Sequence, residues 1–197
     1  GSRGDWRAHF DRIGVLTKPF AASNCGLETP WPPPLVRHHA GKPLKNIRVS
    51  AGDPSSPSGL RSVRGEATIT RYGLEGNAIY PMVPAVRHAL AHGMKAHVII
   101  DLKPDVPEHV LAGRLHDASP EERTAALRLD RAAMALLKAH TSKEEIKAPE
   151  LLAHAAKHLR VPISGPRPID EAISTVGGIA LEEVAPDLSL RKHPHLF

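Results

Sequence analysis

Hydrophobic and polar residues alternate along residues 64–70, with Ala67 and Ile69 on one side and polar side chains on the other. A period of two with β-branched residues predicts a half-buried strand. Gly73 and Gly76 follow it, and glycines at such spacing let the backbone turn sharply or take a positive φ. This stretch therefore predicts a strand that ends in a glycine-bracketed turn, and the rest of the chain is arranged around it.

A second alternating stretch covers residues 44–51 and predicts another strand. Its two expected faces are Leu44, Asn46, Arg48 and Ser50, and Lys45, Ile47, Val49 and Ala51. Residues 52–59 contain only turn-forming residue types, which indicates a hairpin tip or a flexible loop leading into the strand at 64–70.

Beyond Gly76 the apolar residues recur at helical spacing, in the set Ala78, Ile79, Met82, Val83, Val86 and Leu90. This spacing predicts a helix that ends at Gly93, with Pro81 and Pro84 in its first turn. Backbone amides that lead into a helix can present N–H groups to an anion or polar ligand. The alternative is that the two glycines only make a tight connection. Without other evidence we favour this alternative, because two glycines are a weak signal for a ligand site.

Further elements lie on both sides of this unit. We expect Trp31 in an extended, proline-rich surface stretch at 29–34, and His38 and His39 in a loop. Gly177 and Gly178 are expected to break a strand, either to form a hairpin or to let a ligand approach the backbone closely. The remaining predictions are a helix at 5–13, a turn at 23–26, and strands at 15–21, 95–102, 161–164, 172–175 and 179–184.

The composition changes between residues 108 and 160, which are rich in alanine, leucine, arginine and glutamate. Residues 119–122 form a capping-box sequence, and Pro149 stands at the start of a further apolar stripe. We expect three helices here, inserted as a small bundle between strands. The chain is therefore predicted to be an α+β protein.

Thirteen histidines include two pairs spaced four residues apart, which on a helix could both reach one metal ion. The pairs are His88 with His92 and His154 with His158. Neither belongs to a His-Glu-x-x-His motif, so we interpret both as exposed helix faces. No metal site is predicted, and a metal-dependent hydrolase is rejected on spacing.

The 197 residues are 41% hydrophobic and 24% charged, as in a soluble globular protein. The net charge of +5 is spread along the chain without a basic block, which argues against nucleic-acid binding and suits an anionic cofactor. Cys25 is the single cysteine, so neither an intrachain disulfide nor a thiolate zinc site can form. With no signal-peptide pattern or membrane-length apolar run, we expect a cytoplasmic protein without membrane contact.

Several segments agree in order and spacing with one family: residues 1–6, 23–26, 43–46, 64–76, 101–104, 166–168 and 171–178. They resemble the BaiN/RdsA-type family of FAD-dependent, NAD(P)H-linked oxidoreductases, within a flavoprotein branch. The family pattern after the strand is close to Thr-His-x-Gly-Leu-Ser-Gly-Pro. Here residues 70–77 read Thr-Arg-Tyr-Gly-Leu-Glu-Gly-Asn, so Arg71, Glu75 and Asn77 depart from the pattern and the family's histidine has no counterpart.

The resemblance implies a six-stranded, mostly antiparallel β-barrel-like subdomain (1–103 with 161–197) and an inserted three-helix lobe (104–160). Family members begin with a Gly-x-Gly-x-x-Gly fingerprint that holds the cofactor's pyrophosphate, and this chain has no such motif. We therefore expect the middle insert region of a flavoprotein, with the two FAD-binding Rossmann halves of the same polypeptide absent and both chain ends cut.

On this resemblance, FAD is held mainly by residues outside the chain, and NAD(P)H is the electron donor. The implied role is a substrate or cap domain that covers the flavin, inactive by itself, with a small-molecule substrate. The cofactor-contacting candidates are Thr175, Gly177, Gly178, Ser2 and Gly4, and the substrate-side candidates are Asn24, Cys25, Arg71 and Tyr72. Each has a purely structural alternative, and the chain as a whole has one too: a free-standing, non-catalytic module that binds a ligand or a protein.

Overall fold

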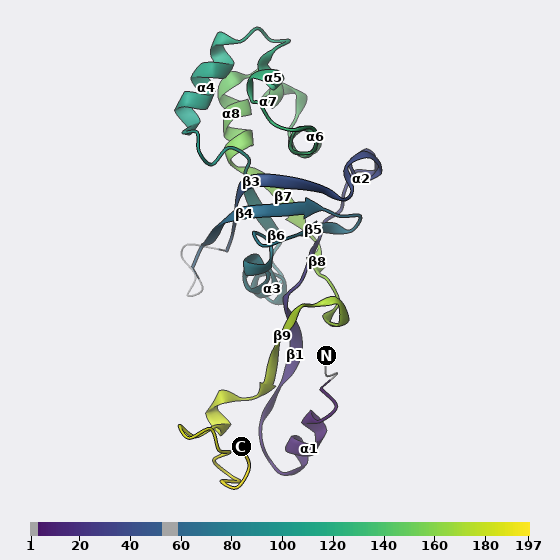
Figure 1. Ribbon diagram of the computed structural model, residues 1–197, viewed down its shortest axis with the longest axis vertical. Helices are drawn as coiled ribbons and strands as arrows, with labels where there is room; N and C mark the ends of the chain where they lie inside the picture. Colours follow the sequence, from purple (N-terminus) through teal and green to yellow (C-terminus); the bar gives the residue numbers. More distant parts are fainter. Residues whose placement is uncertain (1–3, 53–58) are drawn as a thin grey trace. The chain divides into compact units, whose positions relative to one another are not determined.

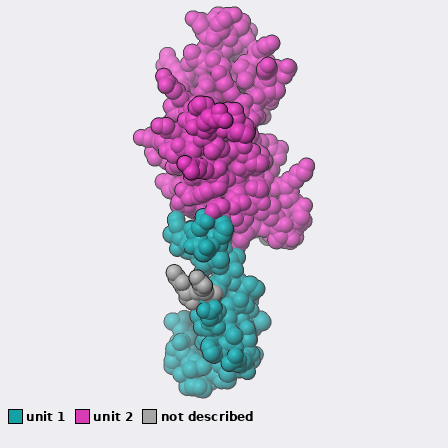
Figure 2. Space-filling model, turned by 90° about the vertical axis from the view of Figure 1, so that its right-hand side faces the viewer, with its two compact units in different colours: residues 1–24, 168–197 teal, residues 25–167 magenta. Residues whose placement is uncertain are grey.

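A computed structural model describes residues 4–52 and 59–197, and these residues form two compact units. Unit 1 comprises residues 1–24 and 168–197, and unit 2 comprises residues 25–167 (Figure 2). Most of the expected hairpin loop at 52–59, like Ser2, lies outside the described residues. The predicted division into 1–103 with 161–197 and 104–160 stays a prediction.

Unit 2 is built on an antiparallel sheet with the strand order β7-β6-β3-β4-β5-β2-β8 (Figure 1). The strands are β2 (Leu27–Glu28), β3 (Lys42–Ala51), β4 (Arg61–Ile69), β5 (Gly73–Glu75), β6 (Ala96–Asp101), β7 (Leu159–Ile163) and β8 (Gly165–Pro166). Large aliphatic side chains from these strands are fully buried, and they form the core together with side chains from the helices.

The long hairpin β3–β4 confirms the two alternating stretches, with one correction. Its register shifts between Leu44 and Ile47, and Asn46 at the shift has a positive φ of 51°. Such an irregularity puts Leu44 on the buried face together with Ile47 and Val49. The prediction that Leu44 lies opposite those residues was wrong, because strict alternation assumes an unbroken ladder.

The glycine-bracketed turn is a tight connection between chain segments. A side chain at Gly73 would collide with the carbonyl oxygen of Leu27, and one at Gly76 with the carbonyl of Glu66. The amide of Gly73 donates to Thr70 Oγ1 (3.0 Å), and that of Ala78 donates to the Glu66 carbonyl (3.2 Å). These amides are occupied within the protein, and the glycines serve close strand approach.

The helix predicted after this turn is present in two parts, η1 (Tyr80–Met82) and α3 (Val83–Ala91). Met82, Val83 and Val86 are buried, as their spacing predicted. Pro81 and Pro84 occupy first-turn positions of η1 and α3, where their missing N–H groups cost nothing.

The helical lobe contains five helices among the described residues, so the prediction of three was wrong. They are α4 (Glu108–Asp117), α5 (Arg123–Ala126), α6 (Arg131–Ala139), α7 (Lys143–Lys147) and α8 (Pro149–Lys157). Helices α5 and α6 are separated at Arg128, whose φ is +50°, and Asp130 caps α6 by accepting from the amide of Ala133. In the view of Figure 1 this lobe lies above β3, and α3 lies below β6.

Helix α2 (Pro33–His39) takes the place of the loop expected at His38 and His39, and it begins inside the extended stretch expected at 29–34, whose first four residues are not helical. Pro33 stands in the first turn of α2, and His38 and His39 lie in its last turn. Trp31 is half-buried, because its indole N–H donates to the Thr70 carbonyl (3.1 Å) and its ring contacts that of His140 edge-on. The loop prediction was wrong, and the extended stretch ends two residues early, because proline is compatible with a helix start as well as with extended chain.

Unit 1 contains α1 (Arg7–Arg12) and a two-stranded antiparallel ribbon of β1 (Thr17–Asn24) and β9 (Ser174–Ile179), with η2 (Ile169–Glu171) and η3 (Leu181–Glu183). The glycine pair does not break the second strand; β9 continues through Gly177 and Gly178. The strand expected at 179–184 is instead the short helix η3, which corrects that prediction.

The fold class is therefore α+β with antiparallel sheets, as the sequence predicted. The described strands do not close into a ring: β7 and β8 stand at the two ends of the seven-stranded order. Among the described helices, none combines the length and the apolar character that a bilayer crossing requires.

Candidate functional site

Two of the cofactor-contacting candidates of unit 1, Gly4 and Gly178, lie against one aromatic side chain, Phe20. A Cβ atom on Gly4 would lie 2.5 Å from the Phe20 ring, and Gly178 faces the rings of Phe20 and Trp6. Trp6 and Phe20 contact each other edge-on, with ring centroids 5.7 Å apart. Gly4 and Gly178 are both buried, so each has a packing reason to be glycine.

Gly177 and Thr175 differ from these two because both are exposed. Strand β1 carries an extra residue opposite Gly177, since Lys18 pairs with Gly178 and Ala21 with Val176. Gly177 has a φ of +114°, and a side chain there would collide with the Pro19 carbonyl oxygen. The β9 backbone at Gly177 thus has a fixed conformation and is open to solvent on its outer side.

In unit 2, two substrate-side candidates meet at one residue that sequence reasoning did not select. The amide of Arg167 donates to the Gly26 carbonyl (2.9 Å) and its guanidinium stacks on the Tyr72 ring at 4.3 Å. Burial raises the pKa of the Cys25 thiol, against the opposing effect of a hydrogen bond from the Arg167 backbone and of nearby arginine charges. Cys25 and Tyr72 therefore share Arg167 as a neighbour.

Two carboxylates complete this cluster, which we call the Arg167 cluster: Cys25, Glu28, Tyr72, Glu75 and Arg167. Glu28 accepts from Arg167 Nη1 at 2.8 Å, and Glu75 accepts from the Tyr72 hydroxyl. Gly26 lies against Tyr72 and Glu75, and a side chain at Gly26 would clash with Tyr72 and contact Glu75 tightly. Strands β2, β5 and β8 converge here, so the cluster depends on pairing that a sequence scan does not reveal.

The other two substrate-side candidates do not join the Arg167 cluster. Arg71 is exposed at the turn before β5. Asn24 belongs to β1, where it pairs with Ser174 and its carbonyl accepts from the amide of Ile173 (2.7 Å). A missed signal was Arg167 itself, since it stands in the Pro-Arg-Pro segment at 166–168 that contributed to the family resemblance.

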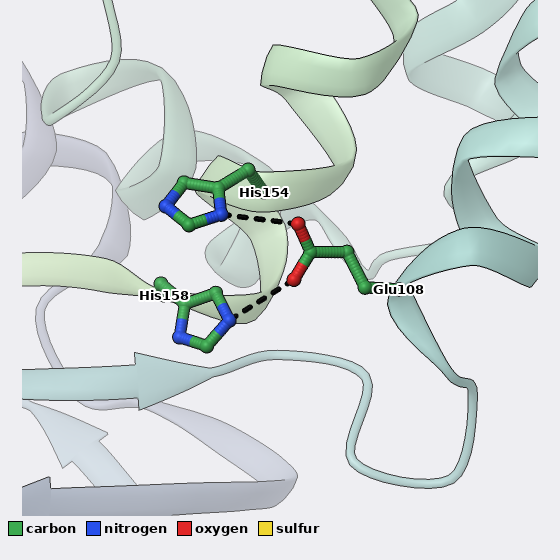
Figure 3. Close-up of side chains that lie close together, drawn as sticks. All are labelled: Glu108, His154 and His158. Atoms are coloured by element: carbon green, nitrogen blue, oxygen red, sulfur yellow. Dashed lines mark hydrogen bonds and ion pairs between the residues drawn. The ribbon is translucent and has the colours of Figure 1, made fainter.

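A third group of side chains lies in the helical lobe and includes one of the histidine pairs. His154 Nδ1 and His158 Nε2 each lie 3.0 Å from a different carboxylate oxygen of Glu108 (Figure 3). Burial raises the pKa of Glu108, but the two histidines oppose it and the net pKa is below the ordinary value. The three ligand-type atoms all lie within 4.8 Å of one another.

The antiparallel sheet with its helical lobe defines an α+β domain. A family model described as the HI0933-like protein barrel and H2TH domain matches residues 21–174, which include all of unit 2. The chain belongs to this HI0933-like family, within the BaiN/RdsA-type flavoproteins. A search of curated proteins finds no match to the chain.

Proposed function

We propose that this chain is the substrate or cap domain of an FAD-dependent oxidoreductase, where it covers the flavin and shapes the substrate pocket. The observation that carries the proposal is the family match over residues 21–174, which makes the chain part of a flavoprotein-type protein. The partner it requires is an FAD-binding domain on the same polypeptide, and NAD(P)H is the proposed electron donor in a cytoplasmic setting.

The residues of this chain fit a contact with the flavin ring, and they do not fit a site for the whole cofactor. The sequence contains no Gly-x-Gly-x-x-Gly segment to hold a pyrophosphate. Strand β9, however, exposes the Thr175 side chain and the Gly177 backbone. When bound, FAD supplies the hydride chemistry, and the protein contributes orientation and electrostatics.

In this proposal Thr175 and Gly177 contact the cofactor directly. Gly4 and Gly178 act through packing, since the absence of a side chain at each leaves room for the neighbouring aromatic rings, Phe20 at Gly4 and both Phe20 and Trp6 at Gly178. Ser2 remains a candidate for a cofactor contact outside the described residues.

The Arg167 cluster is the proposed substrate-side surface. The Tyr72 ring is held between Arg167 and the carboxylate of Glu75, which fixes an aromatic face and a polar edge. Cys25 is buried and its raised pKa keeps it a thiol at neutral pH, so its part is to fill space beside the cluster. Asn24 and Arg71 stay substrate-side candidates that the cluster does not include.

The test is to compare this chain with the longer polypeptide that its gene encodes. The chain alone should purify without stoichiometric flavin, and the longer protein should be yellow and oxidise NAD(P)H. In the longer protein, Gly177→Val should lower flavin occupancy, whereas Gly113→Val, at an exposed helix position with open space around it, should not.

Stoichiometric flavin on the chain alone would overturn the proposal. So would a gene product that consists of this chain only and has no flavin, which would favour a free-standing binding module. Full flavin occupancy in Gly177→Val, with the fold intact by circular dichroism, would remove the proposed role of the β9 backbone.

A further inference from the structure

The helical lobe brings together a carboxylate and two imidazoles in an arrangement that suits a divalent transition metal. Glu108 is the first residue of α4, and His154 and His158 lie in the last turn and at the C-cap of α8. The two histidines are four residues apart, so both project from the same side of the helix. Their rings lie 4.6 Å apart and are tilted by 31°.

The three side chains converge on one point from two elements far apart in sequence. Figure 3 shows both imidazoles turned toward the Glu108 carboxylate, each toward a different oxygen. Ligands of a tetrahedral zinc ion lie about 3.3 Å from one another, given metal–ligand bonds of about 2.0–2.2 Å. The two nitrogen–oxygen distances of 3.0 Å, each to a different oxygen of Glu108, are close to that spacing. One ligand-type atom from each of the three residues lies within 4.8 Å of the other two.

The backbone around Glu108 is held in place by a largely buried lysine of α8, whose side chain is 11% exposed. Lys157 Nζ donates to the carbonyls of Lys103 (2.7 Å) and Val106 (2.8 Å) and pairs with the Asp101 carboxylate at 2.7 Å. These bonds fix the turn that leads into α4 against α8, the same helix that carries both histidines. The backbone that carries the three ligands is therefore held in place without a metal.

The electrostatic surroundings favour a cation at this point. The Glu108 carboxylate supplies one negative charge, and Glu145 is close enough to His154 for their charges to interact. Two imidazoles and a carboxylate are the donor set that suits zinc and its neighbours in the first transition series. The side chains of His154 and His158 are 63% and 49% exposed, so a fourth position is open to water.

We propose that Glu108, His154 and His158 form a zinc-binding site that links α4 to α8, with water as the fourth ligand. The other histidine pair provides a matched control. His88 and His92 are also four residues apart on a helix with rings close together, at 4.2 Å. The described residues place no third ligand beside them, and His92 Nδ1 is directed to the His88 carbonyl at 2.8 Å.

The test is a zinc titration of the metal-stripped chain against a competing chelator, with the melting temperature measured in parallel. The wild type should bind one zinc ion saturably and melt at a higher temperature with zinc than with chelator. Loss of an outer-shell partner typically weakens a metal site about 10-fold to 100-fold, and loss of a ligand costs at least as much. We therefore expect Glu108→Gln, His154→Ala and His158→Ala each to weaken zinc binding at least about tenfold.

The double variant His88→Ala with His92→Ala should bind zinc like the wild type. Cobalt titrated into the metal-stripped wild type should give the visible absorption of a four-coordinate site, and Glu108→Gln should lose it. The proposal is overturned if the wild type shows no saturable zinc binding, if Glu108→Gln binds unchanged, or if the control double variant abolishes binding. These outcomes do not depend on flavin, so they are separate from the test of the proposed function.

Discussion

The two units are stabilised in different ways. The largest fully buried side chains, from Leu27 to Leu136 along the chain, all belong to unit 2. The buried apolar residues of unit 1 are few: Val15, Ala22, Ala180 and Leu190. Its α1 and ribbon pack through Trp6, Phe10 and Phe20, which are all partly exposed.

This difference shows where each unit tolerates change. Burial of aliphatic area is the dominant stabilising contribution in unit 2. In unit 1 the two-stranded ladder, its bulge and two aromatic contacts replace a deep core, and a two-stranded ribbon is marginal by itself. Substitutions that remove volume should therefore act most strongly in unit 2, and substitutions that disturb backbone geometry should act most strongly in unit 1.

The largest expected effect is the loss of a core side chain in unit 2. Ile69 in β4 is fully buried, so Ile69→Ala should lower the free energy of unfolding by about 2–5 kcal/mol. The matched change in unit 1 is Leu181→Ala, at a residue that is 83% exposed, and it should stay within about 0.5 kcal/mol of wild type. Urea denaturation measures both. Equal losses in the two variants would contradict the contrast between the units.

A medium effect is expected from backbone geometry in unit 1. Gly177→Ala forces a side chain onto a φ of +114° and against the Pro19 carbonyl, at a cost of about 1–3 kcal/mol. Gly113→Ala in α4 is the control, because nothing lies near its Cβ position and alanine favours helix by about 0.5–1 kcal/mol. Hydrogen exchange should accelerate across β1 and β9 in the first variant only. Unchanged exchange there would show that the bulge relaxes freely.

The smallest effect concerns pH and a histidine of unit 2. Burial lowers the pKa of His140, and its buried Nε2 has no hydrogen-bond partner among the described residues. The folded state therefore favours the neutral ring, whereas the unfolded chain takes up a proton near pH 6.5. Stability should fall as pH drops below about 6.5 and level off below the lowered folded-state pKa.

His140→Gln should make the melting temperature less sensitive to acid between pH 7.5 and 5.5, measured against wild type. Because the other histidines remain in both proteins, the difference between the two curves isolates His140. Parallel curves would mean that the ring is protonated equally in the folded and unfolded states.

Local chemistry was enough to predict much of the fold. The alternation in residues 44–51 and 64–70 identified β3 and β4, and the spacing from Ala78 to Leu90 identified η1 and α3. Prediction from local pattern failed where an element depends on a partner strand. The register shift near Leu44 and the continuity of β9 through Gly177 both come from pairing between strands.

The candidate sites also divide into residues that the sequence could identify and groupings that only the folded chain brings together. Cys25, Tyr72, Gly4, Gly177 and Gly178 were selected from the sequence or from the resemblance it carries. The Arg167 cluster and the Glu108 site could not be selected, because each joins residues 46 or more positions apart.

By itself, the sequence determined the class of fold, most of its elements, and the family, because periodicity and short motifs are local properties of the chain. Only the tertiary structure decided which chemistry-bearing side chains meet. His88 with His92 and His154 with His158 have the same spacing, and one pair faces a carboxylate because α4 packs against α8. That packing depends on the aliphatic core and on the largely buried Lys157, and no local pattern encodes either.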